Sequence, residues 1–66
     1  DFKVGNIALE LKIKGQPVRI FRQLERYAEH KEVEYIVLAT SKHMALPDTI
    51  NGKPAFVINL SKNLLY

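Results

Sequence analysis

The chain contains no cysteine and no tryptophan, and it has only three glycines among its 66 residues. Without cysteine it can form neither a disulfide nor a thiolate metal site. Its longest apolar runs are far shorter than the ~20 residues that a membrane-spanning helix requires, and no pattern of a signal peptide is present. We therefore expect a cytoplasmic protein without membrane contacts.

A chain of 66 residues is long enough for one domain with a thin core. Ten Lys and Arg residues against seven Asp and Glu residues give a net charge of +3 and a pI near 9.4. A mildly basic protein is compatible with a polyanionic partner. The chain begins with Asp instead of Met, so we interpret residues 1–66 as a single domain that could be a fragment or the core of a longer chain.

The first fourteen residues are typical of a β-hairpin. Predicted strands over 1–4 and 7–14 flank Gly5-Asn6, which is an accepted two-residue hairpin loop. In the second strand apolar residues alternate with Ala8, Glu10, Lys12 and Lys14. This period of two predicts one face in the core and the other toward solvent or a cleft.

The hairpin loop also predicts which residues face each other. If Gly5-Asn6 forms the turn, Val4 faces Ile7 and Asp1 faces Glu10. Directly opposed residues have Cβ atoms ~5 Å apart on one face of the sheet. Two carboxylates so placed repel each other unless a cation lies between them. Lys12 follows Glu10 on the same face.

Residues 17–30 are predicted to form an amphipathic helix that begins at Pro17. Its apolar stripe at helical spacing consists of Ile20, Phe21, Leu24, Tyr27 and Ala28. Another face carries Arg19, Arg22 and Arg26. Gln23 lies between these faces and is stacked with Tyr27 at i,i+4.

The rest of the chain completes an α/β domain. Residues 35–40 form a continuous apolar run that is typical of a buried parallel strand, which predicts a right-handed βαβ crossover with the preceding strand and helix. Residues 41–48 are expected to form a loop or a short helical turn. Asn51-Gly52 indicates a turn. Residues 55–60 are predicted to form a last strand, which begins after Pro54 and lies at an edge of a mixed sheet.

These positions suit the hydrolysis of a phosphodiester, which needs a hard cation with oxygen ligands and a positive group near the reacting phosphate. Asp1, Glu10 and the backbone carbonyl of Leu11 would hold the metal. Lys12 would orient water or stabilise the transition state, and Gln23 would position that water or touch a phosphate. The residues expected to contact the DNA backbone are Lys14, Arg19, Arg22 and Arg26.

The same residues resemble the motifs of a known family. The pattern Asp1…Glu10-Leu11-Lys12 resembles the D…(D/E)-x-K signature of the PD-(D/E)XK nucleases, and Gln23-Leu24-Glu25-Arg26-Tyr27 resembles the Q-x-x-x-Y motif of the RecB-like and lambda-exonuclease-like branch. The resemblance covers residues 1–40. It implies a restriction-endonuclease-like core and a nuclease, an endonuclease in our interpretation, that cleaves DNA with Mg²⁺ or Mn²⁺. Asp1, Glu10, Lys12 and Gln23 would be catalytic, and Tyr27 would support them.

Simpler interpretations remain for each feature. Glu10 and Lys12 could form the wet face of an antiparallel strand, and the arginines could form a solvated helix face. Tyr27 could be a core aromatic. The rival to a nuclease is a non-catalytic DNA-binding or assembly module with the same fold. Because the core is thin, we also expect a homodimer, which could exchange or pair strands.

Overall fold

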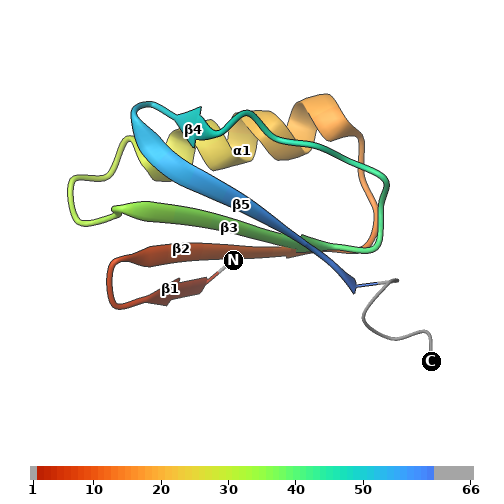
Figure 1. Cartoon of the computed structure of the whole chain (residues 1–66), viewed down its shortest axis with the longest axis horizontal. Coiled ribbons are helices and arrows are strands. Elements are labelled where there is room, and N and C mark those ends of the chain that lie inside the picture. Colours follow the sequence, from red (N-terminus) through yellow and green to blue (C-terminus); the bar gives the residue numbers. More distant parts are fainter. Residues whose placement is uncertain (1, 61–66) are drawn as a thin grey trace.

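The structure is a computed structural model that describes residues 2–60. Its elements are β1 (Phe2–Val4), β2 (Ile7–Lys12), α1 (Pro17–Ala28), β3 (Tyr35–Thr40), β4 (Thr49–Ile50) and β5 (Lys53–Asn59). The strands form one sheet in the order β1-β2-β3-β5-β4, and α1 lies across one side of it (Figure 1). Strand β3 is parallel to β2 and β5, whereas the outer pairs are antiparallel. The predicted α/β class with a mixed sheet and a crossover helix is therefore confirmed.

The N-terminal hairpin has the predicted register. Phe2 pairs with Leu9 and Val4 with Ile7, across a turn in which Gly5 has a φ of 60°. A positive φ at the first turn residue but not at Asn6 matches a type II′ turn, whose twist suits a hairpin. The predicted partner of Glu10, Asp1, lies outside the described residues. Strand β2 ends at Lys12, two residues earlier than predicted.

The alternation in β2 predicts that its apolar face lies in the core, and the structure corrects this prediction because α1 covers the opposite face. Ala8 and Glu10 are only 4% and 2% exposed because their side chains face α1, whereas Leu11 is 48% exposed on the opposite face. The interpretation of Glu10 as part of a wet face is therefore wrong. The crossover connection carries α1 over the Glu10 face, and no second helix among residues 2–60 covers the other.

The core lies between α1 and the sheet. Ile20, Leu24 and Ala28 of the predicted apolar stripe are buried, and they belong to one cluster with Ile36 and Leu38 of β3. Phe21 and Tyr27 are partly buried at its margin. The helix ends at Ala28, two residues before the predicted end, and it is neither long nor apolar enough to cross a membrane.

The last third of the chain differs from the prediction in two respects. Residues 41–48 form a loop, which is one of the two predicted alternatives, but the chain then forms the short strand β4, which the sequence pattern did not reveal because it has only two residues. Asn51 and Gly52 have φ values of 51° and 77°, the pattern of a type I′ turn that joins β4 to β5. Because β4 pairs with β5, the predicted edge position of the last strand is wrong.

Candidate active site

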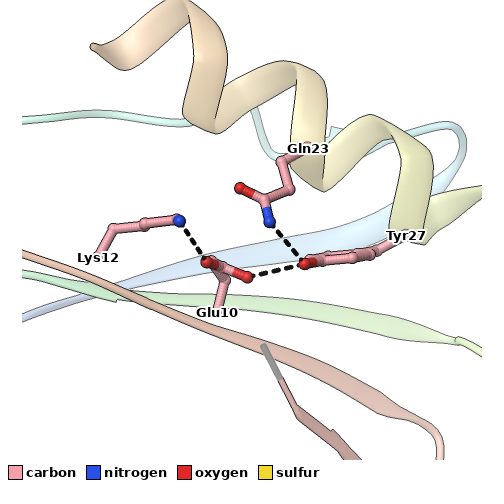
Figure 2. A network of polar contacts seen from close by, with 4 residues as sticks. All are labelled: Glu10, Lys12, Gln23 and Tyr27. Atoms are coloured by element: carbon pink, nitrogen blue, oxygen red, sulfur yellow. Dashed lines mark hydrogen bonds and ion pairs between the residues drawn. The ribbon is translucent and has the colours of Figure 1, made fainter. Parts of the chain in front are cut away.

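Glu10 lies in the middle of a polar network between β2 and α1. Its carboxylate is buried, with 2% of the residue exposed. One oxygen, Oε1, accepts a hydrogen bond of 3.0 Å from the Tyr27 hydroxyl, and the other, Oε2, lies 3.2 Å from the ammonium of Lys12 (Figure 2). A buried carboxylate is tolerated when its charge is paired and its oxygens accept hydrogen bonds. The network therefore allows an ionised carboxylate under the helix.

The two helical residues of the network are one turn apart on α1. Gln23 donates from Nε2 to the Tyr27 hydroxyl oxygen at 2.8 Å, so the amide leaves the Tyr27 proton directed at Glu10. Burial raises the pKa of the Tyr27 phenol above its ordinary value, and the hydrogen bond to Glu10 raises it further. Tyr27 therefore remains a proton donor to Glu10 at neutral pH.

Lys12 connects this buried network with the surface. Its side chain is 33% exposed, whereas that of its partner Glu10 is 2% exposed. The two residues lie two positions apart on β2 and therefore point to the same face of the sheet, as the sequence predicts. An ammonium has three N–H donors, so Lys12 can pair with Glu10 and still face a ligand.

A basic groove adjoins the network. It encloses about 530 Å³ between the end of β2 and the side of α1 that carries Arg19, Gln23 and Arg26. Its wall includes Gln23 and the five cationic side chains of Lys12, Lys14, Arg19, Arg22 and Arg26, and none of the described residues that line it is acidic. Cations gathered in a hollow raise the local concentration of anions. The groove therefore suits a phosphate backbone, and two of its lining residues, Lys12 and Gln23, also belong to the Glu10 network.

The described residues offer a divalent metal only part of a site. Among residues 2–60, no group of three or more His, Asp or Glu side chains is placed to hold an ion. Mg²⁺, however, commonly binds through one or two carboxylates and completes its shell with water and substrate phosphates. Glu10 supplies one carboxylate beside the groove. The next residue, Leu11, could add its backbone carbonyl, since it lies beyond Leu9, the last residue of β2 that pairs with β1. An ion bound at Glu10 would therefore take most of its ligands from water and from substrate phosphates.

Most of the predicted site residues come together in space. Glu10, Lys12, Gln23 and Tyr27 form one network, and the four predicted DNA-contacting cations line the groove beside it. Asp1 lies outside the described residues. The sequence did not identify Tyr27 as the direct partner of Glu10, because the two residues are 17 positions apart and only the helix packing joins them. The only signals of this network in the sequence were the i,i+4 spacing of Gln23 and Tyr27 and the E-x-K spacing of Glu10 and Lys12.

Thr40 is a second buried polar residue that the sequence analysis passed over. It is fully buried at the end of β3, opposite Lys12 in the register. Its hydroxyl accepts a hydrogen bond of 3.1 Å from the backbone N–H of Lys42. Thr40 is thus the last residue of β3, and its hydrogen bond fixes the start of the following loop. It stabilises the end of β3 beside Lys12 of the network.

Replacing Tyr27 with Phe tests the network without removing the ring. At neutral pH we expect the free energy of unfolding to fall by ~1–3 kcal/mol, because a buried oxygen of Glu10 loses its donor. The raised pKa of Tyr27 means that the folded state holds the phenolic proton more tightly than the unfolded chain. The stabilisation is therefore complete below the ordinary value of 10.0 and is lost as the pH rises through the folded pKa.

Urea unfolding of the parent and of Tyr27→Phe over a series of pH values measures this difference. The two stabilities should differ at neutral pH and converge above about pH 10. Lysines also lose their charge in that range, but they do so in both proteins. A gap between parent and variant that stays constant up to high pH would contradict the assigned hydrogen bond.

Comparison with known protein families, with characterised proteins and with solved structures gives no match to this chain. The function is therefore inferred from the geometry of the site itself.

Proposed function

We propose that this protein is a metal-dependent deoxyribonuclease that hydrolyses phosphodiester bonds of DNA as an endonuclease. One observation carries the proposal: a buried carboxylate, Glu10, is paired with a partly exposed lysine, Lys12, which is one of five cations that line a groove. A groove that only bound DNA would have no need for a buried carboxylate beside its phosphate-binding wall, since that charge repels the ligand.

The residues divide the work according to their positions. The groove cations, which include Lys14, Arg19 and Arg22, would bind the DNA backbone beside the network. Glu10 would hold the divalent ion together with the Leu11 carbonyl, and a bound ion supplies an activated water and neutralises phosphate charge. Lys12 would stabilise the negative charge that develops on the reacting phosphate. Gln23 would orient the water or a phosphate oxygen, and Tyr27 would fix the Glu10 carboxylate.

The order of elements supports the finer assignment to a restriction-endonuclease-like core. The hairpin, the strand with the carboxylate and lysine, the helix with Gln23 and Tyr27, and the buried parallel strand follow in the order on which the PD-(D/E)XK resemblance rests. The proposed second carboxylate of the metal site, Asp1, lies outside the described residues.

The alternative function is a non-catalytic DNA-binding module. It is favoured by the state of Glu10, whose two oxygens face Tyr27 and Lys12, and by the lack of a three-ligand cluster among residues 2–60. In such a module the ion pair would be structural, and only the basic groove would act.

Incubation with DNA separates the two functions. Supercoiled plasmid and labelled single-stranded DNA are incubated with the protein in Mg²⁺, in Mn²⁺ and in EDTA. We expect nicked or linear plasmid only when a metal is present, because the metal supplies the activated water. DNA that is bound in a gel-shift assay but stays intact in every metal would overturn the nuclease and support the binding module.

A further inference from the structure

The face of the sheet opposite α1 is apolar along β1, β2, β3 and β5. The register places Phe2, Leu9, Val37 and Phe56 in one row across β1, β2, β3 and β5, and Leu11 and Ile58 in the next row but one. Phe2 is 59% exposed, Phe56 53% and Leu11 48%. Figure 1 shows α1 on one side of the sheet and no helix on the other. We call this surface the open face.

Charged residues of the strands lie on the other side. Lys3, Glu10 and Lys12 are one residue out of step with the open-face rows and therefore point toward α1. On β1, β2, β3 and β5 no described residue of the open face is charged. Strands with one solvent-exposed face normally alternate buried apolar residues with exposed polar ones. Parallel sheets, by contrast, are normally covered on both faces. The sequence of these strands is thus typical of a sheet that is covered on both faces, and α1 covers only one of them.

The size of the open face fits a second copy of the chain. With Phe2, Tyr35 and Phe56 at 59%, 40% and 53% exposure, and ~150–250 Å² available to bury for each aromatic side chain, these three alone offer about 300 Å². With the exposed aliphatic residues the face reaches roughly 500 Å², near the upper limit for a monomer surface. Two such faces together approach the ~1,000 Å² that a specific interface needs.

We propose that two copies of this chain pack their open faces against each other. Apolar side chains of two sheets interdigitate when the sheets stack ~10 Å apart, and a two-fold axis lets one patch serve both copies. The dimer would give each thin core its second layer. It differs from a dimer made by pairing or exchanging strands, because the contact uses side chains and leaves the sheet edges alone.

The arrangement has a consequence for the basic groove. Since α1 and the groove lie on the side of the sheet away from the open face, the two grooves of the dimer point in opposite directions. Each would engage its own DNA segment. The two sites would therefore not meet on the two strands of one duplex, and dimer formation does not depend on whether the protein cuts DNA.

Sedimentation equilibrium over a dilution series tests the dimer. We expect the parent to show the mass of two chains when concentrated and of one chain when dilute, with a melting temperature that rises with concentration. Phe56→Lys places a charge among the aromatic and aliphatic side chains of the open face and should shift the mass to one chain at all concentrations. Val18→Lys is the matched control, because Val18 is 60% exposed but lies on α1, and this variant should dimerise like the parent.

The dilution series of the parent is read first, because a charge on the open face could also unfold the protein. A parent that stays monomeric and binds a hydrophobic dye such as ANS overturns the proposal and assigns the face to another occupant, either a further segment of a longer chain or a different protein. A dimer that survives Phe56→Lys with circular dichroism unchanged also overturns it, since the interface would then lie elsewhere.

Discussion

Replacing Glu10 with Gln should lower the rate of DNA cleavage by ~10²–10³-fold, the usual loss when one electrostatic group of an active site is removed. Glutamine has nearly the same shape and keeps an oxygen that can accept the Tyr27 hydroxyl, which now donates at 3.0 Å. It lacks the negative charge that a divalent ion needs. The variant should therefore fold and bind DNA while it fails to cut.

The matched control is Glu29→Gln, which makes the same chemical change at an exposed carboxylate just after α1. Cleavage by this variant should equal that of the parent. Gel shifts and circular dichroism of both variants show whether binding and fold persist. Cleavage by Glu10→Gln at the parental rate would mean that the carboxylate has a structural role only, and the nuclease proposal would then fail.

Replacing Leu24 with Ala should have the largest effect on stability. Leu24 is 0% exposed, in the cluster that joins α1 to β3. Loss of a buried leucine costs ~2–5 kcal/mol through lost burial and the cavity that remains. A domain of this size has little stability to spare, so the variant should be largely unfolded at ordinary temperature or melt far below the parent.

Val18→Ala provides the control on the same helix, since Val18 is 60% exposed and its truncation should change stability by less than about 0.5 kcal/mol. Urea or thermal unfolding followed by circular dichroism measures both variants. Because α1 carries Gln23 and Tyr27, the Leu24→Ala variant should lose any cleavage together with its helical signal. A Leu24→Ala protein as stable as Val18→Ala would show that α1 does not pack on the sheet as described.

Local patterns were sufficient for much of the fold. The Gly5-Asn6 loop predicted the hairpin register, because a two-residue turn fixes which residues face each other. The helical spacing from Ile20 to Ala28 predicted the buried side of α1, and the unbroken apolar run of β3 predicted a strand parallel to β2. Strand β4 escaped prediction because two residues have no periodicity, and its pairing moved β5 away from the edge.

The sequence by itself thus determined the N-terminal hairpin, the helix, the two longer strands that follow it and the composition of each face, since these follow from side-chain spacing along the chain. Only the tertiary structure decided which face of β2 is covered, because both of its faces carry residues that can be buried, and the crossover selects one. That choice buries Glu10 and brings Tyr27 against it from 17 residues away. It also leaves the apolar side of the same strand exposed, which no local pattern could have shown.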